Sequence, residues 1–539
     1  MINKMRAVKN ILFITTLLCY LFSGDVFAQS NLIQSSEKFK AALATVSAAY
    51  VDSINEDKLI EYAIVGMLQE LDPHSVYISK EELNEMNEPL VGNFDGVGIQ
   101  FQILKDTVMV VSAIPGGPSE KLGIQAGDKI IKIELENVAG TGIKNNDVMK
   151  KLRGDKGTEV NVSIMRRGAE ELLEYNITRD KIPLYSLDAS YMATPEIGYI
   201  KLNRFAQNTM EEYQSAIDEL NKKGLKHLIL DLRGNGGGYL HIAIALADEF
   251  LNDKKLIVYT EGLRQLKQES YATKAGRFEK GKLIILIDEG SASASEIVSG
   301  AVQDWDRGLV IGRRSFGKGL VQKPFSLPDG SAMRLTTARY YTPTGRSIQK
   351  PYEEGTEAYY KDLQTRFKHG EFTQKDSISF PDSLKFYTPN HRLVYGGGGI
   401  MPDIFIPLDT SFNSNFYIDM VRKGILTQFA LTYLDMNRQS MTEKFPTIEV
   451  FKSNFVVDEN LLNELVAYAE KEGIKKVENE LERSGKLIET QLKALIAQNL
   501  WQRNGYFEVY NEMDETYQKA LEVLEDNTFE KMKLNYVNK

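Results

Sequence analysis

The spacing of hydrophobic residues changes several times along the chain and divides it into segments. Apolar residues recur at helical intervals over residues 32–86, which predicts helices, the second of which stops at Pro73. From Asn93 the pattern becomes short runs separated by glycine turns, which is typical of a small β-domain. Between Ile197 and Ile287 strand-like runs alternate with helical stretches, and this alternation predicts an α/β core with a buried sheet.

The remaining chain is polar or helical. Residues 350–393 show little periodicity and are expected to form an irregular segment at the surface, a surface excursion from the core. After Thr410, one-sided apolar stripes predict helices that pack together or self-associate. The fold class is therefore a multi-domain α/β protein. The predicted segments are a signal peptide at 1–28, an N-terminal helical segment at 29–88, a small β-domain at 89–180, an α/β core at 181–410 and a C-terminal helical domain at 411–539.

The N-terminus has the layout of a secretory signal. Three basic residues precede the apolar run Ile11–Phe22, and Ala28 ends a plausible cleavage site. Cys19 is the only cysteine of the chain, so cleavage removes it and excludes both disulfides and thiol catalysis. We expect an exported, periplasmic protein without a membrane span after cleavage. An uncleaved segment, which would hold the protein at the membrane, is the alternative.

Charge and motif spacing exclude several classes of function. The net charge of −9 and the scattered basic residues argue against a nucleic-acid partner. The five histidines lack the spacing of metal ligands, and we expect neither a metal nor a cofactor. Residues Gly312–Lys318 begin like a phosphate-binding loop, but Gly319 replaces the required hydroxyl residue and a strand follows. A glycine turn after residues 228–232 lacks the third glycine of a dinucleotide site.

One turn has the features of a nucleophile site. The buried strand Leu283–Ile287 leads through small residues into a helical run that begins near Glu296, and Ser293 lies at the turn. Such a turn exposes a side chain and directs backbone N–H groups and the helix dipole towards it. Lys318 lies between glycines in apolar surroundings, where burial would lower its pKa and let it act as a base. The pair predicts a Ser–Lys dyad. The alternative is a turn serine and a solvated lysine.

The spacing of these residues resembles the core motif of the carboxy-terminal processing, or tail-specific, proteases. The resemblance implies a protease core like those of ClpP and the crotonases, with Ser293 as nucleophile, Lys318 as general base and Gln322 as the residue that orients the lysine. It adds Gly237 to the Ala294 N–H as a second oxyanion donor. The matching segments are Leu71–Ser75, Arg233–Gly238, Ser291–Ile297, Val302–Asp304, Phe316–Gln322 and Tyr340–Gly345.

The acidic residue of the motif, Asp304, is harder to place. A carboxylate close to the lysine would raise its pKa and oppose catalysis. We therefore expect a structural role for Asp304, paired with Arg233 or Arg307.

Residues 89–180 look like a PDZ domain, because Pro118–Asp128 resembles the turn-and-strand signature of protease-associated PDZ modules. The N–H groups of Gly96, Val97, Gly98 and Ile99 can form a nest for a terminal carboxylate, and the adjoining strand edge can accept a peptide as an added strand. We therefore expect protein or peptide partners with free, apolar C-termini. Arg153 either couples peptide binding to the core or forms a stabilising salt bridge within the domain.

These features together predict a secreted or periplasmic serine endopeptidase. It would recognise the free C-terminus of a protein through the PDZ domain and cleave with the Ser–Lys dyad, in C-terminal processing or tail-specific degradation. Two alternatives without activity are an inactive PDZ scaffold and a tail-binding chaperone of the cell envelope. The C-terminal helices are candidates for self-association or for binding an adaptor.

Overall fold

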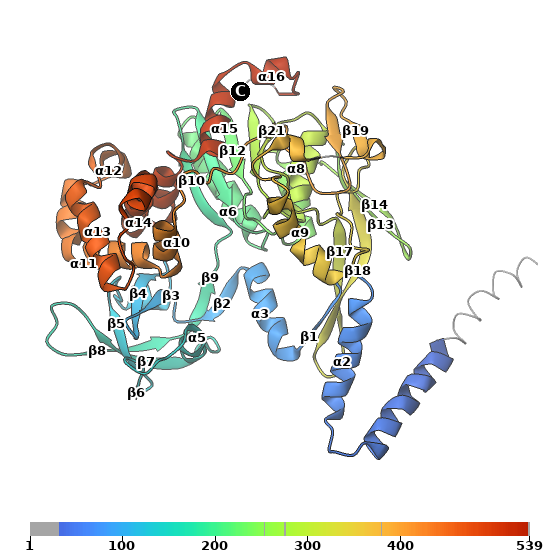
Figure 1. The fold of residues 1–539 in the computed structure, drawn as a ribbon, viewed down its shortest axis with the longest axis horizontal. Coiled ribbons are helices and arrows are strands. Elements are labelled where there is room, and N and C mark those ends of the chain that lie inside the picture. Colours follow the sequence, from blue (N-terminus) through green and yellow to red (C-terminus); the bar gives the residue numbers. More distant parts are fainter. Residues whose placement is uncertain (1–31, 253, 274–275, 379, 537–539) are drawn as a thin grey trace, which may run out of the picture. The chain divides into compact units, whose positions relative to one another are not determined.

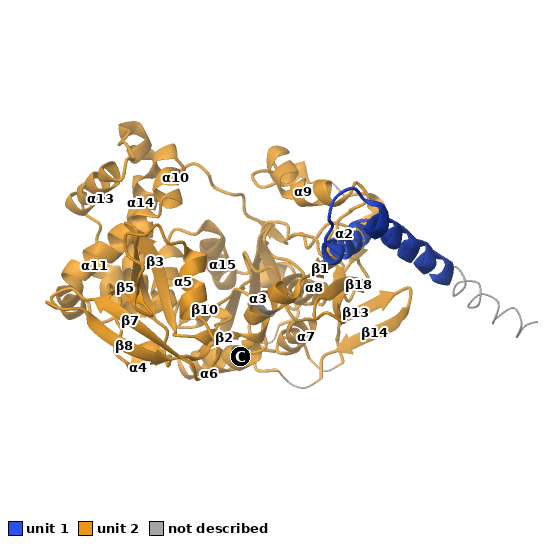
Figure 2. Ribbon diagram, turned by 90° about the horizontal axis from the view of Figure 1, so that it is seen from below, with its two compact units in different colours: residues 1–71 blue, residues 72–539 orange. Residues whose placement is uncertain are grey.

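The computed structural model describes residues 32–252, 254–273, 276–378 and 380–536. These residues form two compact units, and the division falls between Leu71 and Asp72 (Figure 2). The signal peptide expected at residues 1–28 lies outside the described residues. Among the helices that are described, none combines the length and the apolar content needed to cross a membrane.

The first unit consists of two helices, residues 32–49 and α2 (Glu56–Gln69). Asn55 caps α2, because its side chain accepts a hydrogen bond from Lys58 N at 3.0 Å. α2 ends shortly before Pro73, which cannot continue a helix. The helical spacing of this stretch therefore corresponds to helices in the structure.

The second unit begins with β1 (Val76–Ile78) and α3 (Lys80–Val91), which lead into a small β-domain. An antiparallel pair, β2 (Asn93–Gly96) with β9 (Asp180–Pro183), brings the chain into this domain and out of it. The main strands run in the order β3-β4-β5-β7-β8, so β3 (Ile99–Leu104) lies at the edge of the sheet. The other elements are β4 (Thr107–Ala113), α4 (Pro118–Lys121), β5 (Lys129–Ile133), β6 (Glu136–Asn137), α5 (Asn145–Leu152), β7 (Glu159–Met165) and β8 (Leu173–Thr178).

A six-stranded sheet with the order β10-β11-β12-β15-β16-β21 forms the α/β core (Figure 1). Neighbouring strands from β11 to β21 are parallel, and β10 pairs antiparallel with β11. All five residues of the central strand β15 (Leu283–Ile287) are buried, which confirms the predicted buried sheet. The other elements are β10 (Leu187–Met192), β11 (Ile197–Leu202), α6 (Thr209–Lys222), β12 (His227–Asp231), α7 (Leu240–Asp248), α8 (Ala294–Asp304), β16 (Leu309–Gly312) and β21 (Ile404–Phe405).

Different parts of the chain cover the two faces of this sheet. On one face α6, α7 and α8 pack against alternate strand residues such as Leu230. On the other face α15 (Glu515–Glu525) and α16 (Thr528–Lys531) pack against residues such as Ile229. The last helices of the chain thus belong to the hydrophobic core on one face of the sheet, although their sequence indicated only a C-terminal helical domain.

A second, antiparallel sheet has the order β1-β18-β13-β14, and β17 also pairs with β18. Through β1 it connects the beginning of the second unit to the strands that follow α8, with Tyr77 opposite Met333. Its strands after β1 are β13 (Leu256–Gly262), β14 (Gln265–Tyr271), β17 (Leu320–Ser326) and β18 (Ala332–Tyr341).

The segment expected as a polar surface excursion, residues 350–393, is more structured than its sequence suggests. It contains α9 (Thr356–Lys368), in which Tyr359 and Arg366 are buried. These are polar side chains held by hydrogen bonds and ion pairs, so they leave no apolar periodicity in the sequence. The remaining elements are the short helices η1 (Lys375–Ser377) and η2 (Asp382–Leu384) and the hairpin of β19 (Lys385–Tyr387) and β20 (Leu393–Tyr395).

The C-terminal helices form a bundle around their own apolar cluster. The longest, α14, has non-helical backbone angles at Trp501 and Gln502 and then continues towards the core sheet. The bundle also contacts the β-domain, where Lys105 forms an ion pair with Glu472 at 3.1 Å. Its helices are α10 (Asn415–Arg422), α11 (Ile425–Lys444), α12 (Ile448–Asn454), α13 (Glu459–Lys471) and α14 (Glu478–Tyr510).

Candidate active site

Ser293 lies at the turn between β15 and α8, as the sequence predicted, and immediately precedes the first residue of the helix. Its backbone has φ +56° and ψ −109°, a conformation that non-glycine residues rarely adopt. Strained backbone of this kind concentrates at functional sites, where surrounding contacts must hold it in place. Ala294, which begins α8, has one of the N–H groups that lack a partner within the helix.

The carboxylate of Glu296, on the first turn of α8, supplies those contacts. Its Oε2 accepts from Ser293 N at 2.7 Å and from Lys318 N at 2.9 Å. Its Oε1 accepts from Gly317 N at 2.7 Å and from Ser315 Oγ at 2.5 Å. One buried carboxylate therefore joins the turn of the serine to the turn of the lysine. Burial raises the pKa of Glu296 to about 7, while these hydrogen bonds oppose the shift.

Lys318 occupies the second turn and is half-buried. Burial lowers its pKa, and the positive charge of Arg334 lowers it further, whereas the carboxylates of Glu296 and Asp72 raise it. Tyr340 fixes the same pair of turns from β18, because its hydroxyl lies 2.5 Å from Lys318 O and 3.1 Å from Ser293 O. The site therefore holds a lysine whose charged form is disfavoured, close to a strained serine turn.

The glycine turn after β12 lies directly against Ser293. A Cβ atom added to Gly237, whose φ is +104°, would stand 2.9 Å from Ser293 Cβ, so the close approach requires glycine. Asn235 ties the two turns together, because its carbonyl accepts from Ala292 N at 3.0 Å and from Ser295 Oγ at 2.8 Å. In this structure the Gly237 N–H donates to Asn235 Oδ1 at 2.9 Å.

Gln322 lies on β17 but makes a different hydrogen bond from the one expected. Its Nε2 donates to Thr336 Oγ1 at 3.3 Å, and that hydroxyl donates to Asp72 Oδ1 at 3.0 Å. The amide is thus engaged with β18 rather than with Lys318.

Two residues near the lysine have no counterpart in the sequence-based site. His74 Nε2 lies 2.9 Å from the hydroxyl of Tyr359, and burial together with the charge of Lys318 lowers the pKa of His74 to about 4. Tyr359 comes from α9, in the segment that showed no periodicity, so no sequence signal indicated it. The backbone N–H of His74 donates to Asp72 Oδ1 at 2.8 Å.

The expected partners of Asp304 were wrong. Asp304 forms a buried ion pair with Arg346 at 2.7 Å and accepts from Thr344 N at 3.0 Å. Arg233 instead pairs with two other aspartates, and Arg307 donates to backbone carbonyls. The correct partner could not be found from spacing, because Arg346 reaches Asp304 only after the chain has passed through β16, β17 and β18.

The expected peptide-binding residues lie around a groove of the β-domain. Gly96 ends β2, Ile99 begins β3, and Gly98 has φ +76°. Val97, Gly98, Ile99 and Arg153 line an apolar cavity of about 100 Å³ between β3 and α5. Among the described strands β3 lies at the edge of this sheet, so the cavity lies beside an edge strand.

Arg153 contacts a residue outside this domain. Its Nη1 lies 2.7 Å from Glu88 Oε2 on α3, and its guanidinium lies over the ring of Phe94 at 4.7 Å from the centroid. The ion pair therefore does not stay within residues 89–180, as the stabilising alternative assumed.

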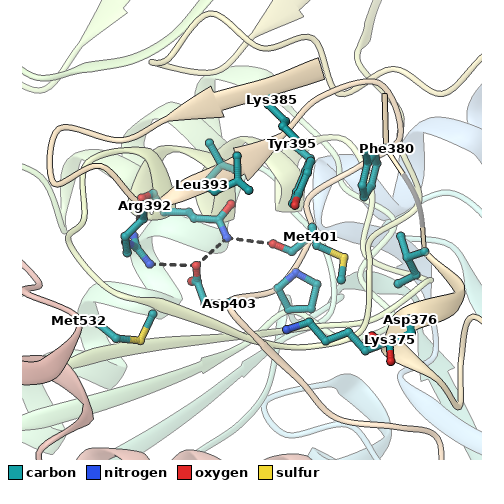
Figure 3. A pocket seen from close by; sticks show the side chains of 14 residues that line it. Lys375, Asp376, Phe380, Lys385, Arg392, Leu393, Tyr395, Met401, Asp403 and Met532 are labelled. Atoms are coloured by element: carbon teal, nitrogen blue, oxygen red, sulfur yellow. Dashed lines mark hydrogen bonds and ion pairs between the residues drawn. The ribbon is translucent and has the colours of Figure 1, made fainter. Parts of the chain in front are cut away.

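A larger cavity, of about 620 Å³, lies at the opposite end of α8 from Ser293. Asp403 lies on its wall beside Arg392 (Figure 3). Asp403 pairs with Arg392 at 2.8 Å and accepts a hydrogen bond from Gln303 Nε2 at 3.1 Å. Burial raises the pKa of Asp403, as it does that of Glu296. The cavity contains no residue expected at the active site.

Comparison with known families assigns the same regions. Residues 196–358 match peptidase family S41, and residues 96–177 match a PDZ domain. Residues 23–82 match the N-terminal domain of the activating protease CtpB, and residues 416–502 match a family of unknown function.

Relatives agree with these matches. The chain is 40% identical over 326 residues to a carboxy-terminal-processing protease of Bartonella bacilliformis, covering 60% of this chain and 74% of that protein. It is 35% identical over 333 residues to the carboxy-terminal processing protease CtpB of Bacillus subtilis, covering 61% and 68%. Among solved structures, a photosystem II D1 C-terminal processing protease is 27% identical with a TM-score of 0.36, covering 68% of this chain and 92% of that one.

The S41 match includes the turns of Gly237, Ser293 and Lys318, and the PDZ match includes most of the residues that line the apolar groove. These assignments disfavour both alternatives without peptidase activity. This chain therefore belongs to the carboxy-terminal processing proteases of peptidase family S41 and is a serine-type peptidase with a PDZ domain.

Proposed function

We propose that this peptidase is exported to the periplasm, captures the free C-terminus of a protein in its PDZ groove, and cleaves the chain with a Ser293–Lys318 dyad. The observation that carries the dyad is the Glu296 carboxylate, which holds the N–H groups of both residues within 2.9 Å. The signal-like residues 1–28 support export.

The chemistry follows from the two side chains. The neutral Lys318 amine takes the proton of Ser293 Oγ as that oxygen attacks the peptide carbonyl, and the resulting ammonium returns the proton to the leaving amine. Water then attacks the acyl-serine, again with the lysine as base. The lowered pKa of Lys318 favours the neutral amine that the first step needs.

The developing oxyanion would be stabilised by the N–H groups of Ala294 and Gly237. The close approach of Gly237 to Ser293 supports its role as an oxyanion donor. To take this role, its N–H must give up its hydrogen bond to Asn235 Oδ1 and donate to the oxyanion instead. Gln322 would similarly break its hydrogen bond to Thr336 and bond Lys318 instead when substrate is bound, which would orient the lysine. We assign Asp304 a structural role, because Arg346 neutralises it.

Tail recognition is proposed to take place at Gly96, Val97, Gly98 and Ile99, with the peptide added to the edge of β3. The apolar lining of the adjacent cavity favours an apolar last residue. An unfolded substrate with a free apolar C-terminus should therefore be cleaved faster than the same substrate with a C-terminal amide or a terminal aspartate. The difference should appear in kcat/KM, measured by separating the products over time. Equal rates for all three would remove the PDZ groove from the mechanism.

Arg153 is proposed to couple peptide binding in the PDZ groove to the activity of the protease core. It lines the cavity and pairs with Glu88 on α3, and α3 leads back to β1 of the second sheet. Arg153→Ala should weaken the stimulation of a short reporter peptide's hydrolysis by a separate apolar tail peptide, while the unstimulated rate stays the same. Arg179→Ala is the matched control, because Arg179 donates to Leu152 O and Lys151 O within the PDZ domain. Full stimulation in Arg153→Ala would contradict the coupling.

A further inference from the structure

We infer that Asp514, from the C-terminal end of the chain, is a positioning residue for the glycine turn that carries Gly237. It would act through Arg233, which opens that turn. The inference rests on the proposed function, because it takes Gly237 as an oxyanion donor next to Ser293. It adds a part of the chain outside residues 196–358, the S41 match, to the catalytic apparatus.

Arg233 is held between two carboxylates. Its Nε and Nη2 donate to Asp231 at the end of β12, at 3.0 and 2.6 Å. Its Nη1 donates to both oxygens of Asp514, at 2.9 and 2.7 Å. The side chains of Arg233 and Asp514 are only 17% and 14% exposed, so solvent screens this pair less than a surface pair. Asp514 thus completes the set of partners of a guanidinium that Asp231 alone would leave half-satisfied.

The first turn of α15 fixes Asp514 itself. As the N-cap of α15, Asp514 accepts from Tyr517 N at 2.8 Å. The ring of Tyr517 packs edge-on against Tyr199 at 5.4 Å, and the Tyr199 hydroxyl donates to Asp231 Oδ2 at 2.7 Å. Asp514 therefore approaches Arg233 from a helix that packs on the sheet and belongs to its core cluster.

The turn that begins at Arg233 is connected to Ser293. Arg233 O accepts from Lys201 Nζ at 2.7 Å, and Gly234 N donates to Asp288 Oδ1 at 2.8 Å. Asn235 then bonds the segment around Ser293, and Gly237 contacts Ser293 itself. A shift of Arg233 would therefore move the N–H of Gly237 relative to the reacting carbonyl. Misplacement of a catalytic group by about 1 Å can cost roughly 10² in rate.

Asp514→Ser tests the inference, because serine still caps a helix but is too short to reach Arg233. We expect kcat to fall about tenfold, less than the roughly 10² to 10³ for complete loss of an oxyanion donor. KM should stay the same. A peptide aldehyde, whose serine adduct carries the oxyanion, should lose affinity in proportion to kcat, whereas the corresponding peptide alcohol should bind as before. Asp514→Asn, which keeps one acceptor oxygen, should give an intermediate kcat.

Asp458→Ser is the matched control, because Asp458 caps α13 in the same C-terminal region and accepts from Leu461 N at 2.9 Å without contacting Arg233. The Asp458→Ser variant should retain the wild-type kcat, although its Tm should fall about as much as that of Asp514→Ser. An unchanged kcat in Asp514→Ser, even with a lower Tm, would overturn the inference. So would an equal loss of affinity for aldehyde and alcohol. Full cleavage by Ser293→Ala would count against the proposed nucleophile instead, a result that the Asp514 variants cannot produce.

Discussion

Replacing Ser293 with alanine or Lys318 with methionine is expected to lower kcat by roughly 10⁴-fold or more on an unfolded protein with an apolar C-terminus. The first change removes the attacking oxygen, and the second removes the base while it keeps the length and apolar stem of the side chain. Each variant should still bind the substrate's C-terminus, because the groove that we assign to it lies in the β-domain. The measurement is cleavage under saturating substrate, with tail-peptide binding measured in parallel.

Lys323→Met is the matched control, since Lys323 is an exposed lysine on the same strand, β17. It should cleave at the wild-type rate. The pH dependence adds a second check, because only the neutral amine of Lys318 accepts a proton: activity should rise with pH through the lysine's lowered pKa and be lost as pH falls. Undiminished cleavage by either active-site variant would end the dyad proposal.

Replacing Glu296 with glutamine is expected to cost about 10² in kcat, because the turns of Ser293 and Lys318 would lose their common acceptor. An amide has one acceptor oxygen, and its NH₂ group would face backbone N–H donors of these turns. Each buried N–H left unsatisfied costs about 1–3 kcal/mol, so the free energy of unfolding should also fall. KM should change little, since the expected tail contacts lie elsewhere.

Asp403→Asn separates the loss of stability from the loss of activity. Asp403 is also a buried carboxylate with a raised pKa, and it accepts a hydrogen bond from Val310 N at 2.8 Å. It lies at the other end of α8, where it accepts from Gln303. The Asp403→Asn variant should have a lower free energy of unfolding and a nearly unchanged kcat. The wild-type enzyme should also lose activity as pH falls below about 7, where Glu296 becomes protonated. A Glu296→Gln variant with wild-type kcat would show that the shared carboxylate is not needed.

Much of the fold could be predicted because local patterns report burial directly. The run Leu283–Ile287 is apolar on both faces, and the structure places it as the central strand between two layers of helices. The turn at Ser293 could be located because a strand and a helix must be joined there. The same logic failed for α9, whose buried residues Tyr359 and Arg366 are polar.

By itself, the sequence indicated most of the elements, their order and the turns of Ser293 and Lys318, because these depend on residue type and short-range spacing, whereas Gly237 was implied only by the family resemblance. Only the tertiary structure decided which groups meet. In the structure Asp304 pairs with Arg346, and Asp514 pairs with Arg233. The Glu296 carboxylate accepts hydrogen bonds from the turns of both Ser293 and Lys318, and Gln322 donates to Thr336. Such pairs are separated by up to 281 residues, and which charge reaches which partner depends on how the sheets and helices pack.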